Sequence, residues 1–371
     1  MLRQEEQLMP GFDAGCVLPE KKVSHEAHIM NNEVVAYGGV LERVIAKDNL
    51  TRQETYRAFG QIMDGQWSES RIAGLLVALA AKGETAEEIA GAAEAMRRHV
   101  VRIDTGGADV VDTCGTGGTG LNTFNISTAA AMVLAGTGVK VAKHGNRTST
   151  RVSGSADVLA ALGVNLDASP EVIARCLEQA GVCFCFAIRC HPAMKYAAPV
   201  RKQLGVRTIF NVLGPLTNPA GARRQVMGVF DGELTELIAE TLLKLGAVRA
   251  MVVHGDDGLD EISTTSVTKV SELKDSRINT YVVQPEDFHL PRARMAELAT
   301  KSPEDSARII TEVLNGAEGP ARDVVLLNAA AAIAVADKAP DIRAALPQAA
   351  QAIDSGAAAE ALKKLVEISN S

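Results

Sequence analysis

Apolar residues in the first third of the chain recur at helical spacing, and two of these runs begin with capping signals. Thr51-Arg-Gln-Glu54 and Thr85-Ala-Glu-Glu88 have the form of capping boxes, in which a Thr hydroxyl and a Glu carboxylate satisfy free N–H groups at a helix start. The first predicts a helix that ends near Asp64-Gly65, and the second predicts a helix that runs to about Val101.

A third apolar run lies between these two helices. Ile72–Ala81 follows Ser68, which can cap it, and stops at Lys82-Gly83. No strand pattern interrupts the three runs. Residues 37–104 are therefore predicted to form a small helical domain, completed by helices around 192–222.

The pattern then changes to short β-branched runs that alternate with helices. One helix is framed by Ser169-Pro170 at its start and by Gly181 just past its end. The tail from Ser302 onward is Ala-rich and helical. This alternation predicts an α/β domain over 105–371, with a mostly parallel central sheet covered on both faces. The expected strands are Val110-Val111, Val139–Ala142, Val182–Ile188, Val226–Phe230 and Ala250–Val253.

Residues 1–36 show no sustained period. They form either a loose N-terminal extension or a segment ahead of a natural start at Met30.

Charge and composition exclude several classes of protein. The 371 residues are 47% apolar, which is enough for a sizeable core, and carry a net charge of −7. A general nucleic-acid binder is normally basic, so no nucleic-acid partner is expected, and any bound anion must be held by a local site. With no signal-peptide core and no run of ~18 uncharged apolar residues, we expect a cytoplasmic protein without a membrane partner.

The six cysteines form no regular framework, which favours free thiols in a reducing compartment. Cys183, Cys185, Cys190 and His191 raise the question of a zinc site. However, Cys183 and Cys185 alternate inside a buried strand and no second cluster has ligand spacing. Free core thiols are favoured, while the reactivity of Cys114, beside a Gly-rich segment, is left open.

The Gly-rich segment Asp112–Gly120 follows a predicted strand, and Asn125–Thr128 then opens a helix. Glycines let the backbone approach a phosphate, and a helix N-terminus offers free N–H groups. The next strand ends in Lys143, where a dinucleotide fold would need an acidic residue, and no Walker A sequence is present. The alternative is a tight strand–helix turn.

A second candidate loop, Lys143–Ser155, combines three cations besides His144 with five hydroxyls, two glycines and an amide. Point charges, donors and backbone access are what a pyrophosphate requires. The alternative is a solvated polar loop. His144 by itself is either a general base or a positional residue.

Two further candidates complete the site. Asp260-Glu261 follows the buried strand Ala250–Val253, and paired carboxylates next to a phosphate site suit Mg²⁺, whereas Asp256-Asp257-Gly is a turn sequence. Arg201, on a predicted short helix Lys195–Leu204, can hold a carboxylate through two parallel hydrogen bonds. Its alternative is a surface arginine.

Together these motifs resemble the anthranilate phosphoribosyltransferase family. The similarity runs from about Tyr37 to the C-terminal helices and leaves only residues 1–36 outside. It implies a fold like that of nucleoside phosphorylases and phosphoribosyltransferases. The segments that carry it are Gly115–Gly118, Asn125–Thr128, Lys143–Arg147, His191–Met194, Pro199–Arg201, Arg207–Pro219 and Asp260–Ser263.

Members of that family transfer a 5-phosphoribosyl group from phosphoribosyl pyrophosphate (PRPP) to the amine of anthranilate, in tryptophan biosynthesis, with Mg²⁺. The resemblance implies anthranilate binding by Gly115, Asn146 and Arg201, and Mg²⁺ binding by Ser127, Asp260 and Glu261. Of these, Asn146 and Arg201, together with Lys143, would be catalytic. The implied PRPP-binding residues are Gly115, Gly118, Thr119, Thr123, Asn125, Ile126, Ser127, Thr128, Lys143, His144, Gly145, Asn146, Arg147, Arg151 and Ser155.

Thr119 departs from the family pattern, which usually has Asp at this position. A hydroxyl cannot supply the charge of that carboxylate to a magnesium site, whereas the backbone here remains able to bind PRPP. The resemblance also implies a homodimer joined through the N-terminal helices, whose apolar faces at Tyr37–Ala46 and Ile72–Ala81 are the candidate interface.

Two other functions are weighed against this one. A pyrimidine nucleoside phosphorylase-like enzyme would share the fold but carry a lysine-threonine-glycine phosphate loop, and the Lys143–Arg147 motif argues against it. A non-catalytic relative that binds nucleic acid would need a basic groove, and the net charge of −7 argues against that.

Overall fold

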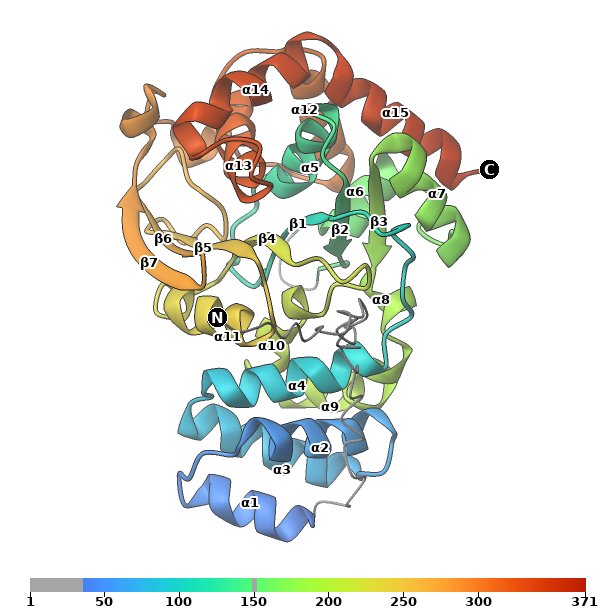
Figure 1. The fold of residues 1–371 in the computed structure, drawn as a ribbon, viewed down its shortest axis with the longest axis vertical. Helices are drawn as coiled ribbons and strands as arrows, with labels where there is room; N and C mark the ends of the chain where they lie inside the picture. The colour runs from blue at the N-terminus through green and yellow to red at the C-terminus, as the bar shows by residue number, and fades with distance from the viewer. Residues whose placement is uncertain (1–35, 149–151) are drawn as a thin grey trace, which may run out of the picture. The chain divides into compact units, whose positions relative to one another are not determined.

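The structure, a computed structural model, describes residues 36–148 and 152–371 (Figure 1). Nearly all of the predicted N-terminal extension and the candidate residue Arg151 therefore lie outside the described residues. Within these ranges, no helix combines the length and the apolar character needed to span a membrane.

The first helices of the chain pack together as a group. Both predicted capping boxes are present: the Thr51 and Thr85 hydroxyls accept the N–H groups of Glu54 and Glu88, whose carboxylates bond back to the Thr N–H groups. Ser68 stands at the start of its helix but does not cap it. The helices are α1 (Tyr37–Ile45), α2 (Arg52–Met63), α3 (Glu69–Lys82) and α4 (Ala86–Arg98).

A single seven-stranded sheet forms the centre of the larger part of the chain, with the order β3-β2-β1-β4-β5-β6-β7. Neighbours from β3 to β5 are parallel, and β6 and β7 add an antiparallel hairpin at one edge. The predicted fold class, a helical domain followed by an α/β domain, is confirmed. The strands are β1 (Val111–Gly115), β2 (Val141–Gly145), β3 (Val182–Phe186), β4 (Arg224–Gly228), β5 (Arg249–Gly255), β6 (Thr268–Lys274) and β7 (Arg277–Val283).

The remaining helices lie between and after the strands, and many of them pack on the sheet. Ser169 caps α7 and Gly181 ends it in the left-handed conformation, as its sequence predicts. The helices that follow α4, with η marking the 3-10 helices, are α5 (Ile126–Gly136), α6 (Ser155–Ala161), α7 (Pro170–Ala180), α8 (Ala187–Cys190), η1 (Pro192–Tyr196), α9 (Ala198–Leu204), α10 (Phe210–Leu213), η2 (Pro215–Thr217), α11 (Leu234–Lys244), η3 (Pro285–Phe288), η4 (Met295–Glu297), α12 (Pro303–Leu314), α13 (Pro320–Val335), α14 (Ile342–Asp354) and α15 (Ala357–Ser369).

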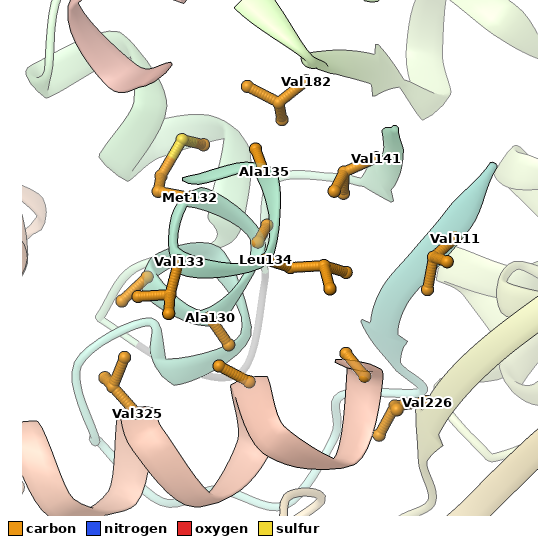
Figure 2. Packing of buried hydrophobic residues seen from close by; sticks show 14 of the residues in the cluster. Val111, Ala130, Met132, Val133, Leu134, Ala135, Val141, Val182, Val226 and Val325 are labelled. Atoms are coloured by element: carbon orange, nitrogen blue, oxygen red, sulfur yellow. The ribbon is translucent and has the colours of Figure 1, made fainter. Parts of the chain in front are cut away.

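Successive strand residues point into two different apolar clusters. Val226 of β4 and Met251 of β5 belong to a cluster with α5, α7 and α12–α15, whereas Met227 and Val252 belong to a cluster with α1–α4, α9–α11 and η2. Figure 2 shows part of the first cluster, in which α5 and α13 pack against each other and both contact the sheet. Both faces of the sheet are therefore buried, and the segment 197–216 shares one core with α1–α4.

Several element boundaries differ from the sequence predictions. The helix that opens at Thr85 ends at Arg98 rather than near Val101, and the strand expected over Val182–Ile188 ends at Phe186, where α8 begins. The short helix expected over Lys195–Leu204 is divided into η1 and α9 at Ala197, because Pro199 in the first turn of α9 has no N–H to continue the earlier turn.

Candidate active site

A cavity of about 340 Å³ opens at the carboxyl ends of β1 and β2, where ligands bind on sheets of this kind. Its walls come from five parts of the chain. These are the Gly-rich loop (Asp112–Gly120), the start of α5, the basic loop (Lys143–Ser155), the segment from α8 to η2, and the acidic pair (Asp260 and Glu261) after β5. It is lined by Cys114, Gly115, Thr116, Gly117, Gly118, Phe124, Asn125, Ser127, Lys143, His144, Gly145, Asn146, Arg147, Thr148, Ser153, Gly154, Ser155, Ala187, Arg201, Phe210, Asn211, Gly214, Pro215, Asp260 and Glu261.

The sheet opens between β1 and β2 beneath this cavity. These strands are in register at only one residue pair, near their starts, whereas β1 and β4 are in register over five pairs. Side chains replace the missing ladder: Asp112 Oδ1 accepts the N–H of His144 at 3.0 Å. The Asn218 amide donates to Ala142 O and to Asp112 Oδ2, both at 2.8 Å. The strand ends therefore separate without leaving these buried backbone groups unpaired.

Lys143 occupies the floor of the cavity. Its ammonium donates to Thr113 O across the opening and lies 3.2 Å from Ser127 Oγ, although the residue is only 2% exposed. Burial lowers the pKa of Lys143, and the nearby buried carboxylate of Asp112 opposes that shift. Since charges interact strongly away from water, an anion placed here would be attracted strongly by this cation.

The acidic pair is anchored to the Gly-rich loop and to the start of α5. Asp260 Oδ2 accepts the N–H of Gly117 at 3.0 Å, and Glu261 Oε1 accepts the N–H of Ser127 at 3.3 Å. A Cβ atom at Gly115 would lie 2.5 Å from Asp260 Oδ2, so this approach requires glycine. The two carboxylates and the Ser127 hydroxyl thus line one cavity.

Asp256 and Asp257 form the predicted turn, and the Asp257 carboxylate also accepts hydrogen bonds from the residues that follow it. Its carboxylate accepts hydrogen bonds from the Ser263 hydroxyl at 2.6 Å, from the Thr265 hydroxyl, and from the N–H of Leu259 at 3.1 Å. Asp257 thereby braces the two ends of the loop that carries the acidic pair.

The basic loop folds back on itself at the cavity mouth. A Cβ atom at Gly145 would lie 2.2 Å from Ser155 Oγ, so a side chain at this position would block the fold. The Ser155 hydroxyl donates to Asn146 O at 3.4 Å, and Arg147 Nη1 lies 3.3 Å from Asp157 Oδ1. The described part of the loop therefore brings the candidate residues Lys143, His144, Gly145, Asn146, Arg147 and Ser155 to one cavity.

Arg201 reaches the cavity from α9, on the opposite wall. Its guanidinium lies over the ring of Phe210, with 5.4 Å between Cζ and the ring centroid. No hydrogen-bond acceptor or carboxylate pairs with it among the described residues. Burial lowers the pKa of Arg201. A half-buried cation without a protein anion is a candidate site for an anionic ligand.

His144 and His191 form a buried pair, with 3.1 Å between their Nε2 atoms. Burial, and then the neighbouring His191, lower the pKa of His144 to about 3, while burial lowers the pKa of His191 to about 4. Both rings are therefore neutral near pH 7 and too weakly basic to serve well as general bases. This favours the positional interpretation of His144.

The cysteines described by the structure are buried and free, as predicted. The Cys114 thiol lines the cavity, but burial raises its pKa well above the ordinary value, so it is a poor nucleophile. Within residues 36–148 and 152–371, no group of three or more His, Cys, Asp or Glu side chains is arranged to hold a metal ion.

Four of the predicted PRPP-binding residues do not line the cavity. Ile126 and Thr128 point into the core, and Thr123 pairs with Ala299 through its backbone. The Thr119 hydroxyl accepts the N–H of Leu121 at 3.3 Å.

Sequence reasoning also missed residues that shape the cavity. Arg207 stacks 4.0 Å from the Phe230 ring centroid and donates to Gly118 O at 2.9 Å, which ties the Gly-rich loop to the segment after α9. Phe210, Asn211, Gly214 and Pro215 line the cavity. All except Phe230 lie in the segment Arg207–Pro219, which was noted for its resemblance but given no role.

Comparison with known proteins covers both parts of the chain. Residues 39–100 match the family model described as a glycosyl transferase helical bundle domain, and residues 107–359 match the corresponding a/b domain. The chain is 52% identical over 336 residues to the anthranilate phosphoribosyltransferase of Desulfosudis oleivorans, covering 90% of this chain and 99% of that protein. The chain belongs to the anthranilate phosphoribosyltransferase family.

Solved structures of the family have the same fold. The Thermus thermophilus member superposes with a TM-score of 0.85 at 41% identity, over 90% of this chain and 99% of that one. The Saccharomyces cerevisiae member, in complex with PRPP and Mg, gives 0.82 at 28% identity, over 91% and 99%. Another structure of the yeast protein holds 4-fluoroanthranilate, with a TM-score of 0.80 at 27% identity over 90% and 99%.

Proposed function

We propose that the protein transfers the 5-phosphoribosyl group of PRPP to the amine of anthranilate, giving N-(5-phosphoribosyl)anthranilate and pyrophosphate. One observation carries the proposal: one cavity joins backbone donors and a buried lysine on one wall to the Arg201 guanidinium on the other, which has no anionic partner among the described residues. The first wall suits phosphates and the second suits the carboxylate of an aromatic acid. Family membership and the ligands of the yeast structures support the same assignment.

PRPP would bind along the Gly-rich loop, the start of α5 and the basic loop. Gly115, Gly118, Asn125 and Ser127 line the first part of this surface, and Lys143 lies at its floor. Arg147 and Ser155 line the cavity from the basic loop. Thr119, Thr123, Ile126 and Thr128 would contribute through their backbones, while Arg151 lies outside the described residues.

The chemistry of the donor set fits Mg²⁺. Asp260 and Glu261 supply hard carboxylate oxygens, and the Ser127 hydroxyl lines the same cavity. Mg²⁺ takes few protein ligands and keeps several waters or substrate phosphates, so these three residues are sufficient to hold it against PRPP. When bound, the ion would neutralise charge that develops on pyrophosphate.

Anthranilate would bind on the opposite wall. The Arg201 guanidinium would pair with its carboxylate, and Asn146 and the backbone of Gly115 would orient the ring. The anthranilate amine is neutral at pH 7 and has a free lone pair, so positioning against C1 of the ribose is the main requirement.

The reaction forms a bond from that nitrogen to C1 and breaks the bond from C1 to the pyrophosphate oxygen. The bonding electrons leave with pyrophosphate, and the nitrogen then loses one proton. Lys143 and the loop N–H groups would stabilise the departing negative charge. No protein nucleophile is needed, which agrees with the high pKa of the Cys114 thiol.

The direct test is to follow the loss of anthranilate fluorescence in the presence of PRPP and Mg²⁺, together with pyrophosphate release. We expect both only when PRPP and anthranilate are supplied together. Release of a free base from a pyrimidine nucleoside and phosphate, without anthranilate turnover, would instead support a nucleoside phosphorylase.

We also propose a homodimer joined through α1 and α3. These helices pack against each other and leave Ile45 and Val77 exposed at 66% and 45%. Burial of such side chains against a second copy would be favourable. Light scattering at micromolar concentration should give twice the chain mass, and Val77→Asp should shift it towards the monomer. A monomer mass for the unchanged protein would contradict the proposal.

A further inference from the structure

Ser306 is a fully buried residue of α12 that does not line the cavity but is bonded to one that does. Its side chain is 0% exposed and lies in the second turn of the helix. The N–H of Asn125 donates to Ser306 Oγ at 3.0 Å, and Ser306 Oγ donates to Asn125 Oδ1 at 3.1 Å. One hydroxyl thus holds both the backbone and the side chain of Asn125, the residue that opens α5.

In the structure the Asn125 amide presents its oxygen to this hydroxyl. Ser306 Oγ accepts the backbone N–H through one lone pair and gives its own proton to Oδ1. The Ser153 hydroxyl donates to the same Oδ1 at 3.0 Å. Two donors therefore hold the oxygen, and the Nδ2 group remains as the donor that Asn125 can offer within the cavity.

The backbone around Asn125 is held from the same direction. Phe124 N–H donates to Leu298 O at 3.0 Å, and Thr300 N–H donates to Asn122 O at 2.8 Å. The segment before α12 thus runs beside the segment before α5. Ser306 is the point at which this support reaches a side chain of the cavity.

We propose that Ser306 is a positioning residue: it holds Asn125 with its amide nitrogen directed to PRPP. This inference rests on the proposed function. A phosphate or ribose oxygen accepts a hydrogen bond from Nδ2, whereas a rotated amide would present its oxygen to the anion. Loss of the Ser306 hydroxyl removes one of the two donors to Oδ1 together with the acceptor of the Asn125 N–H, so the amide is held by Ser153 alone and can rotate more easily. PRPP binding then loses a donor, while the anthranilate wall is unchanged.

The test is the affinity for PRPP, measured by calorimetry with Mg²⁺ and without anthranilate. Ser306→Ala should bind PRPP about ten-fold more weakly, the loss expected for one hydrogen bond to a charged partner. The KM for anthranilate should stay unchanged. Ser271→Ala is the matched control, because Ser271 is also 0% exposed and bonds one side chain, Thr280, at 3.0 Å in the β6–β7 hairpin.

A double-mutant cycle distinguishes positioning from a general loss of stability. If Ser306 acts through Asn125, the double variant Ser306→Ala with Asn125→Ala should bind PRPP no more weakly than Asn125→Ala alone. Additive losses would overturn the inference, as would wild-type affinity in Ser306→Ala. If Ser306→Ala does not fold, Ser306→Cys carries the same comparison, since a thiol is only a weak donor.

The measurement also separates this inference from the proposed function. If the unchanged protein does not bind PRPP, the proposed function fails and the inference falls with it. If the unchanged protein binds PRPP and the Ser306 variants bind equally tightly, only the inference is overturned.

Discussion

The two walls of the cavity are built in opposite ways. On the wall proposed for PRPP, each charged group already has protein partners: Lys143 bonds Thr113 and Ser127, and Asp260 bonds the Gly117 N–H. On the wall proposed for anthranilate, the Arg201 guanidinium rests on the face of Phe210 and has no anionic partner among the described residues. The first wall is organised without a ligand, whereas the second would be completed by the proposed ligand. Changes on the first wall should therefore affect both chemistry and structure, and changes on the second should affect ligand affinity alone.

The largest effect is expected from Lys143→Met, which removes the buried cation but keeps a side chain of similar length. Turnover should fall by roughly 100- to 1000-fold, the loss typical of removing one group that stabilises developing charge. The control is Lys140→Met, because Lys140 bonds the carbonyl of Leu177 at 2.9 Å outside the cavity. Steady-state assays of both variants make the comparison, and near-normal turnover in Lys143→Met would contradict the role of this wall.

Asp260→Asn combined with Glu261→Gln tests the magnesium site on the same wall. The amides keep the shape of the loop but remove its charge, so the Mg²⁺ concentration for half-maximal rate should rise by roughly 10- to 100-fold and turnover should fall. Asp256→Asn, in the exposed turn of the same loop, should behave like the unchanged protein. An unaltered Mg²⁺ dependence in the double variant would remove the assignment.

Arg201→Ala tests the opposite wall. The KM for anthranilate should rise about 10- to 100-fold, since a hydrogen bond to a charged partner is worth ~1.5–3 kcal/mol, while the KM for PRPP should not change. The melting temperature should not fall, because burial opposes the charge of this guanidinium, which has no anionic partner in the described parts of the chain. Lys202→Ala, exposed on the same helix, is the control. Equal increases in both KM values would show that the walls are not independent.

The smallest effect concerns how the free energy of unfolding depends on pH through the buried pair His144 and His191. His144 and His191 have pKa values of about 3 and about 4 in the folded protein, below the ordinary 6.5. The unfolded chain therefore binds more protons between these values and pH 6.5, so the folded state loses stability as the pH falls. Each histidine contributes at most about 1.36 kcal/mol per pH unit in that range. Urea unfolding at pH 7.5, 6 and 5 should show this slope, and His191→Gln should reduce it, whereas exposed His289→Gln should not.

The sequence predicts well those features that depend on neighbouring residues. Thr51 and Glu54 are close enough along the chain for their capping box to be recognised, and the strands β1 to β5 are marked by β-branched runs. The β6–β7 hairpin was missed because its strands are largely polar, and because its turn uses Asp275 and Ser276 with positive φ in place of Asn-Gly.

Features that depend on distant residues could not be predicted. Asp112 and Asn218 are 106 positions apart, and no local pattern indicates that they meet between two strands. The motifs brought Lys143, Asp260 and Arg201 forward as candidates, and all three line the cavity. Their partners, and the absence of one for Arg201 within the described residues, follow only from three-dimensional packing.

The opening between β1 and β2 has a consequence for how this chain can change over time. An ordinary strand pair is held by main-chain groups that every residue type except proline supplies, so its hydrogen bonds do not depend on particular side chains. Here the His144 amide depends on the Asp112 carboxylate, and Ala142 O depends on the Asn218 amide. A substitution at position 112 or 218 would leave a buried donor or acceptor without its partner, so these two positions should vary only as a pair. The amide of His144 would record such a change directly, since its hydrogen should exchange with deuterated solvent faster once Asp112 is replaced.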